Sequence, residues 1–323
     1  MARRAVVERT RRMLRTTRVG FLSAALGATF TAATATAQAP EPPAYSEGDV
    51  VRFTIEARSA VEQGEHRYEL AQRATLTCRA VERSTVETRF DCAIDQLEAQ
   101  QRQDERVERF AHPRPQGQDE PPRSAFALLN AALVEEGLRV FVPTTGGVSR
   151  VEGYTQVARA LAQAPEAGAA LLGALGPSSA AANLAPVFGG DLPGADELGE
   201  DGRWRRRREV DAGPGRRLVF DSRWRVVSHE GRRWRLAAQT DVSLEQERAP
   251  GALAVQGEIL DADGRVETVW EAGRLVERNS TLRMSTRFAL GGATVEQTLD
   301  SSVQLRGLEA AEAGDTASEK TGG

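Results

Sequence analysis

Two cysteines are the first residues in this chain whose type and spacing predict chemistry. Cys78 and Cys92 flank Val81–Val86, a segment that favours a hairpin turn centred near Thr85. Such a hairpin places the two cysteines opposite each other on adjacent strands, where an oxidising compartment favours a disulfide. The bridge closes a short loop, so we expect the low end of the usual ~2–4 kcal/mol of stabilisation. Two buried, unlinked thiols are the alternative, because cross-strand pairs are not always aligned for bonding.

The histidines do not form a metal-binding pattern. His66, His112 and His229 lie far from one another and from both cysteines at the spacings that metal sites use. We therefore expect three exposed loop histidines and no bound metal.

Motifs for nucleophilic or phosphate chemistry are also missing from the sequence. No G-x-S-x-G nucleophile elbow occurs, and the glycines at 144–147 and 189–190 lack the lysine and following helix of a P-loop. Asp261 and Asp263 fall in an expected turn, where solvated acids are common, and two-carboxylate chemistry there stays open because it depends on geometry. We expect a protein that is not an enzyme and carries no cofactor.

Arginine and tryptophan are interleaved over residues 203–235, the sharpest local feature of the chain. One interpretation is a face that binds an anionic lipid or polysaccharide. Arginine forms bidentate hydrogen bonds to phosphate, and tryptophan is enriched at interfaces where one end of its ring is hydrated. The candidate residues for that face are Arg205, Arg206, Arg207, Arg208, Arg223, Arg225, Arg233 and Arg235. The other interpretation uses the period of two in a strand, which turns Trp224 and Trp234 toward a core and leaves the arginines in solvent. Trp224 and Trp234 are also expected near opposite each other in one hairpin, which favours core packing.

Alternating apolar and polar residues predict the elements that position these groups. Val51, Phe53 and Ile55 share one parity with polar residues between them, as in a half-buried strand. The expected strands of the N-terminal half are 50–56, 66–74, 75–81 and 86–97. Residues 98–109 are expected as an exposed strand end or a loop, and the proline-rich 111–122 as a loop.

The middle of the chain favours helices. Ser124 is an N-cap for a helix to Glu136, and Gly137 ends it. A hairpin of 138–142 and 148–152 follows, then two or three short helices over 154–188, because three prolines interrupt that stretch. The apolar surface of these helices either lines or plugs a cavity or simply packs on a sheet; its residues are Leu161, Leu171, Leu172, Leu175, Leu184, Val187 and Phe188.

Strands resume after a Gly/Asp/Glu loop at 189–202. Expected strands begin at Arg203 and continue as 218–227, 232–244, 254–262, 265–271, 274–290 and 293–305. Turns are expected at Asp263–Gly264, Gly273 and Gly291–Gly292. The tail 308–323 has little to bury and is expected to be disordered.

The first 37 residues predict export. Seven arginines precede an uncharged stretch, 19–37, which ends in the small-x-small pattern Ala35-Thr36-Ala37. Cleavage is expected between Ala37 and Gln38, because the apolar centre is signal-sized and too short for a span of ~20 strongly apolar residues. Residues 10–14 loosely match a twin-arginine motif, so the general secretory and twin-arginine routes both stay open.

Charge argues against nucleic acid as a partner. The chain has 42 basic and 46 acidic residues, of which the leader holds seven and one, so the mature chain has 35 against 45. An acidic surface of that kind is unsuited to phosphate backbones. The 286 mature residues suffice for one large or two modest domains.

Four segments carry a resemblance to known proteins: 45–48 (Tyr-Ser-Glu-Gly), 147–153 (Gly-Val-Ser-Arg-Val-Glu-Gly), 202–204 (Gly-Arg-Trp) and 273–277 (Gly-Arg-Leu-Val-Glu). With the Thr/Ser/Arg-rich strands to Leu305, the layout resembles a family of uncharacterised secreted bacterial envelope proteins, a domain of unknown function. It is also similar to the half-barrel lipoprotein carriers of the bacterial periplasm. That resemblance implies a curved antiparallel sheet that wraps helices around an apolar cavity, and it brings no catalytic residues.

These observations predict an α+β fold of large, curved, half-barrel-like antiparallel sheets with the short middle helices on the concave face. The expected divisions are 1–37 signal peptide, 38–123 β block, 124–201 helical middle, 202–307 β block and 308–323 tail. The expected function is a non-enzymatic protein of the periplasm or cell envelope that binds a lipid or other amphiphile inside the curve. The alternative is a surface module that binds an anionic partner through the Arg/Trp segment. Ligand identity and oligomeric state are not determined by the sequence.

Overall fold

The computed structural model describes residues 39–114, 124–153, 155, 157, 159, 177–194, 196–211, 216–246, 256–290 and 293–308. The chain divides into two units, Met1–Thr36 and Ala37–Gly323, and every described residue belongs to the second. Several predictions lie outside the described residues: the signal peptide with its cleavage site at Ala37 and Gln38, the four leucines Leu161, Leu171, Leu172 and Leu175, and the tail beyond Leu308. These stay predictions.

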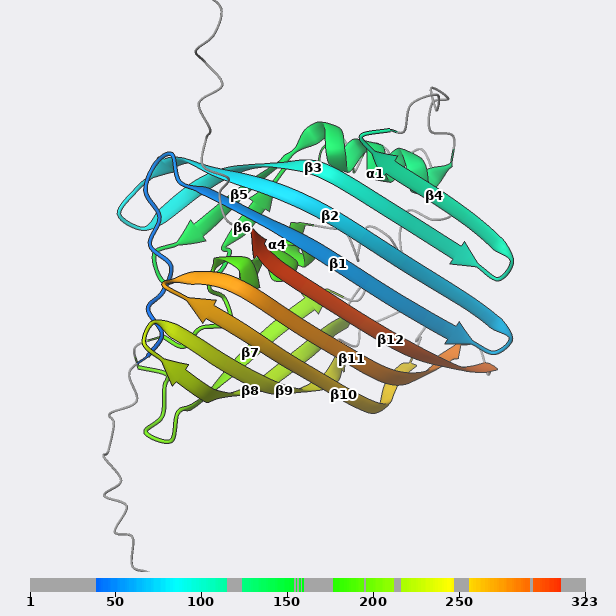
Figure 1. Ribbon diagram of the computed structural model, residues 1–323. Helices are drawn as coiled ribbons and strands as arrows, with labels where there is room; N and C mark the ends of the chain where they lie inside the picture. Colours follow the sequence, from blue (N-terminus) through cyan, green and yellow to red (C-terminus); the bar gives the residue numbers. More distant parts are fainter. Residues whose placement is uncertain are drawn as a thin grey trace, which may run out of the picture. The chain divides into compact units, whose positions relative to one another are not determined.

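Twelve antiparallel strands form one open sheet (Figure 1). Their order is β6-β5-β3-β2-β1-β12-β11-β10-β9-β8-β7, and β4 pairs with the free part of β3 beside β5. The strands are β1 Val50–Gln63, β2 His66–Arg83, β3 Glu87–Gln103, β4 Arg106–His112, β5 Leu138–Pro143, β6 Arg150–Glu152, β7 Arg203–Asp211, β8 Arg216–Glu230, β9 Arg233–Gln246, β10 Gln256–Glu271, β11 Arg274–Leu290 and β12 Ala293–Leu308. The two expected β blocks therefore join through β1 and β12 into a single sheet.

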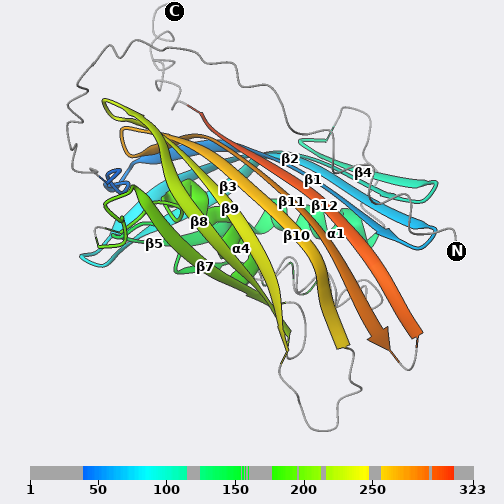
Figure 2. The same cartoon turned by 90° about the horizontal axis from the view of Figure 1, so that it is seen from below.

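The sheet is strongly curved, and the described helices lie under its arch (Figure 2). Strand alternation gives the two faces different characters. On β1, Phe53 is buried on the concave side, whereas Arg52 and Glu56 alternate with it on the convex side. Ion pairs link neighbouring strands across the convex face, such as Arg287 with Glu296 at 2.8 Å and Arg233 with Glu271 at 2.8 Å. The expected antiparallel sheet is confirmed, but the described residues contain only two short helices beside it, so the fold is mostly β rather than α+β.

Aromatic side chains fill one end of the concave face. Tyr45, Phe90 and Phe188 pack with ring centroids 4.9 to 6.0 Å apart, and Trp270 is 1% exposed. Such aromatic contacts contribute roughly 0.5–1.5 kcal/mol each beyond their burial. This cluster is the main core and closes one end of the curve.

Two described helices pack on the concave side of the sheet (Figure 2). Helix α1, Ala125–Glu136, begins where Ser124 Oγ accepts a hydrogen bond from the Ala127 amide and ends at Gly137, so both predicted caps are confirmed. Helix α4, Pro177–Leu184, continues into the 3-10 helix η1, Ala185–Phe188. Because α4 contacts both β6 and β7, it spans the opening between the two edge strands of the sheet.

Some expected element boundaries are wrong. Strand β10 runs without interruption through Asp263 and Gly264, where a turn was expected. Gly264 serves close packing instead, because a Cβ there would lie 2.9 Å from the Cβ of Thr240 on β9. Residues 66–81 likewise lie in one long strand. For the polar 98–109 the strand alternative holds, because they lie in β3 and β4 on either side of a turn at 104–105.

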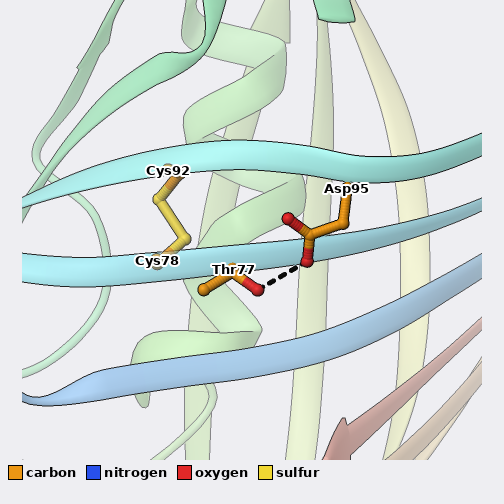
Figure 3. Close-up of a disulfide and its surroundings, with 4 residues drawn as sticks. All are labelled: Thr77, Cys78, Cys92 and Asp95. Atoms are coloured by element: carbon orange, nitrogen blue, oxygen red, sulfur yellow. Dashed lines mark hydrogen bonds between the residues drawn. A yellow bond between two sulfur atoms is a disulfide. The ribbon is translucent and has the colours of Figure 1, made fainter. Parts of the chain in front are cut away.

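The disulfide between Cys78 and Cys92 is confirmed (Figure 3). The two residues are direct partners in the β2–β3 register, and both lie in the core. Beside them, on the opposite face, Thr77 donates a hydrogen bond to Asp95 at 2.6 Å. The bridge ties β2 to β3 next to the aromatic cluster, and a disulfide fits an oxidising location.

Candidate functional site

A cavity of about 550 Å³ lies on the concave side, between the sheet and the α4–η1 segment. Its apolar wall comes from β1, β8, β10, β11 and β12 and includes Ile55, Phe220, Val266, Leu282, Val303 and Leu305. The volume falls within the ~300–1,000 Å³ that small-molecule sites typically have. The cavity therefore offers an apolar surface that the aromatic core does not fill; we call it the concave cavity.

One buried ion pair crosses the concave cavity. Arg278 on β11 donates from Nε to Asp191 Oδ2 at 2.8 Å, and its Nη1 donates to Ser280 Oγ at 2.9 Å. The two side chains are only 9% and 13% exposed. Trp204 Nε1 also donates to the Asp191 carbonyl at 3.2 Å, so this residue is fixed by side chain and backbone together.

A glycine pair places Asp191 in this position. Gly189 ends η1 with a left-handed backbone, φ +86°, which favours glycine. The Gly190 amide donates to the Ala185 carbonyl at 2.7 Å, and a Cβ on Gly190 would lie 2.8 Å from the Ala185 carbonyl oxygen. The two glycines thus let the chain turn tightly after η1 and bring Asp191 back to the sheet.

Two arginines of β7 extend the charged part of the concave cavity. Arg206 donates to Glu197 Oε1 at 2.5 Å and also to the Leu192 carbonyl. Arg208 donates only to a backbone carbonyl, that of Ala182 at 2.9 Å, and its guanidinium lies 5.6 Å from the centre of the Phe220 ring. Burial lowers the pKa of Arg208, Asp191 acts to raise it, and Arg278 lowers it further. Arginine starts so far above neutrality that it stays charged.

Strand alternation divides the predicted Arg/Trp face. Arg206 and Arg208 point into the concave cavity, whereas the other candidates lie on the convex face: Arg205, Arg207, Arg223, Arg225, Arg233 and Arg235. The residues singled out as one face therefore belong to two surfaces. The reason is the period of two in β7, which sends consecutive arginines to opposite sides.

Three of the convex candidates, Arg205, Arg223 and Arg225, line a groove of about 800 Å³ together with Arg203, Arg265 and Ala237. Most of them are neutralised by acids on the same face. Arg205 pairs with Asp221 at 2.5 Å, and Arg223 pairs with Asp241 at 2.7 Å. Within the described part of the chain, Arg225 and Arg235 are the two candidates on this face without an acidic partner. We call the hollow of about 800 Å³ the convex groove; Arg207, Arg233 and Arg235 lie on the convex face outside its lining.

The tryptophans of the segment are core residues. Trp224 is 3% exposed, and its ring stacks on that of Trp204 with centroids 5.7 Å apart. Trp224 faces Ala238 on β9, whereas Trp234 faces His229 on β8 and Trp270 on β10. The expected opposition of Trp224 and Trp234 is wrong, because the turn lies at Gly231 and a bulge shifts the register.

Other candidate residues are scattered over the surface. His66 lies 3.3 Å from Asp104, His229 stacks on Trp234, and His112 ends β4. Asp263 pairs with Arg265 at 2.9 Å within β10 rather than in a turn. Among the residues with described positions, no group of three potential metal ligands comes together. In the same residues no helix combines the length and apolarity that crossing a membrane requires.

A third hollow, of about 620 Å³, lies on the convex side of β1, β2, β11 and β12. Small residues such as Ala60 and Ala71 form its floor, and charged residues such as Arg58, Asp300 and Arg283 surround it. Arg283 and Asp300 pair with each other at 3.7 Å and are 72% and 59% exposed. This hollow is an open, solvated surface with no converging chemistry.

Sequence reasoning did not identify Arg278 or Asp191 as site residues. A signal for Arg278 was present, because it shares the parity of Leu282 and Met284 and is therefore a charge on the apolar face of its strand. Asp191 had no such signal. Its role depends on how the loop after η1 folds back, which no local pattern encodes.

Comparisons with known proteins identify no family. No family model matches the chain, and no curated protein matches it significantly. Among solved structures it is similar to lipovitellin, described for its lipid–protein interactions, with 12% identity and a TM-score of 0.48, over 86% of this chain and 27% of that one. It is also similar to an outer membrane channel of Pseudomonas putida F1 (8% identity, TM-score 0.21, 83% and 98% covered) and to the translocator domain of the autotransporter NalP from Neisseria meningitidis (7%, 0.20, 81% and 89%). The chain thus spans about a quarter of the lipovitellin chain, and all three TM-scores lie below 0.5.

Proposed function

We propose that this protein is a non-enzymatic binding protein of the bacterial envelope that holds an amphiphilic molecule in the concave cavity. The observation that carries the proposal is the apolar wall of that cavity, built from the inward-facing residues of β1, β8, β10, β11 and β12. A strongly curved sheet that only packed on its own helices would not need an apolar surface beyond the aromatic core. Export of the chain is part of the proposal and is supported by the disulfide and by the leader sequence.

The edge-spanning segment supports the same function. Because α4 contacts both β6 and β7 and η1 contacts β11, this segment covers the cavity on the concave side while the sheet itself stays open. A ligand between them and the sheet would be removed from water on its apolar side. Burial of that kind contributes about 25 cal/mol for each Å² of apolar surface.

Filling the concave cavity is expected to weaken binding of an apolar probe. In titrations with Nile red, the wild-type protein should raise the dye's fluorescence to saturation. Ala57→Phe places a ring in the concave cavity and should weaken this binding at least ten-fold, whereas Ala60→Phe, on the same strand but facing the convex hollow, should leave it unchanged. Absence of dye uptake by the folded wild-type protein would exclude the proposal, as would equal affinities of the two variants.

The convex groove supports a second candidate function, the binding of an anionic lipid or polysaccharide. It is favoured by Arg225, a lining residue that lacks an acidic partner in the described structure, and weakened by the ion pairs of Arg205 and Arg223. Exposed pairs contribute only ~0–1 kcal/mol, so a strong polyanion can displace the acids.

This candidate predicts salt-sensitive binding to phosphatidylglycerol vesicles and to dextran sulfate. Binding measured by co-sedimentation should fall several-fold between low and physiological salt, because exposed charges are screened beyond a Debye length of ~8 Å. The double variant Arg223→Gln/Arg225→Gln should abolish it, whereas Arg67→Gln, on β2 away from the groove, should not. Binding that is absent, or insensitive to salt, rejects this candidate and leaves the concave cavity unaffected.

A further inference from the structure

The concave cavity contains more positive charge than its acids neutralise. Arg206 is paired with Glu197 and Arg278 with Asp191, so each acid is already used by one arginine. Arg208 donates to the carbonyl of Ala182, and the acid whose charge acts on it, Asp191, is the one that Arg278 already binds. One cationic group at the edge of an apolar cavity is therefore left without a counter-charge among the described residues.

Among the described residues, three buried donors on side chains that line the cavity lack a hydrogen-bond partner. Trp224, which is 3% exposed, has a buried indole N–H without a hydrogen-bond partner, and the Nε atoms of Arg206 and Arg208 are also buried and unpaired. All three side chains line the concave cavity. Buried donors are normally satisfied, and here every unsatisfied group on the cavity lining is a donor. The chemistry that fits such a lining is an acceptor with negative charge.

We infer that the molecule held in the concave cavity carries an anionic headgroup, a carboxylate or phosphate, which binds to Arg208 and Arg278 while its apolar chain lies along Ile55, Leu282 and Val303. This inference rests on the proposed function and specifies its ligand class. Arg208 on β7 and Arg278 on β11 both line the cavity, and each has an apolar wall residue as its register partner, Phe220 on β8 and Leu305 on β12. The planar guanidinium group of an arginine can donate two parallel hydrogen bonds to two oxygens of such a headgroup.

Asp191 positions Arg278 and still leaves room for a headgroup to bind. Its Oδ2 accepts from Arg278 Nε, whereas the Arg278 Nη1 contact is to a neutral serine hydroxyl. A headgroup can therefore join this arrangement through the remaining guanidinium donors of Arg278 and through Arg208 without displacing the carboxylate. The bound anion would complete the charge balance of three arginines against two acids.

The test is competition against Nile red by ligands that share a sixteen-carbon chain and differ in headgroup. Palmitate and hexadecyl phosphate should displace the dye from the wild-type protein at concentrations at least ten-fold lower than hexadecanol, because hydrogen bonds to charged groups are the stronger ones. Inorganic phosphate alone should not displace the dye, which separates a lipid headgroup from a free anion. Arg208→Gln should reduce the acid-to-alcohol ratio to about one, and because both ligands compete with the dye on the same variant, this ratio does not depend on the affinity for Nile red.

Arg205→Gln is the matched control, since Arg205 lies on the same strand but faces the convex groove. It should keep the ten-fold preference. As a readout that needs no variant, palmitate should raise the unfolding temperature of the wild-type protein more than hexadecanol does. Equal potency of acid and alcohol, with dye binding intact, overturns the inference and leaves the proposed function in place. Absence of binding by dye and by all lipids overturns both.

Discussion

Replacement of Trp270 by alanine is expected to lower the free energy of unfolding by about 3–5 kcal/mol, in the range for buried Trp-to-Ala changes. Trp270 is 1% exposed and lies in the aromatic core between Trp234 on β9 and Leu275 on β11. Its indole N–H has no hydrogen-bond partner, so the loss reports packing and the cavity left behind rather than a broken hydrogen bond. Urea unfolding followed by circular dichroism measures it.

The control for this prediction is Val227→Ala on β8, where the side chain is 55% exposed. Exposed positions of this kind usually change stability by less than ~0.5 kcal/mol. A second variant, Trp270→Phe, keeps most of the ring volume and should lie between the two. If Trp270→Ala costs no more than Val227→Ala, the aromatic cluster is not the core that holds β9, β10 and β11 together.

Local patterns were sufficient for much of the sheet. The parity of Val51, Phe53 and Ile55 identified the concave face of β1, and Ser124 and Gly137 marked the helix ends where the structure has them. In each case the determining interaction is within a few residues, either an alternating side chain or a cap. Such features depend little on the rest of the fold.

The sequence failed where a residue's role depends on a distant neighbour. The pair Asp263–Gly264 is typical of a turn, and a turn was predicted there. The structure instead has a glycine in mid-strand, because Thr240 of the neighbouring strand leaves no room for a Cβ. The arginine run of β7 was treated as one surface, although its alternation assigns Arg206 and Arg208 to the concave cavity and Arg205 and Arg207 to solvent. The pairing of Asp191 with Arg278, 87 residues apart, is a product of topology alone.

Asp191→Ala is expected to destabilise the protein by about 3–5 kcal/mol, because it leaves Arg278 buried without its counter-charge. Arg278 and Asp191 are among the least exposed ion-paired side chains in the described structure, at 9% and 13%. The matched control is Asp221→Ala, which removes the partner of Arg205 in a pair whose members are 37% and 72% exposed. That exposed pair should be worth no more than ~1 kcal/mol. Both variants are compared by urea unfolding.

A double-mutant cycle separates the buried pair from general packing. Arg278→Met alone should also be destabilising, whereas Arg278→Met with Asp191→Leu should recover much of the lost stability, since a buried ion pair can often be replaced by apolar residues of similar volume. Additive single effects would mean that the two side chains do not act as a pair.

The recovered double variant also shows whether the ion pair serves ligand binding or stability alone. It keeps the apolar wall and Arg208 but lacks Arg278, so it should fold and bind Nile red, yet hold palmitate more weakly than the wild-type protein does. If it holds palmitate as tightly as the wild type, Arg278 serves stability alone and the headgroup contact belongs to Arg208.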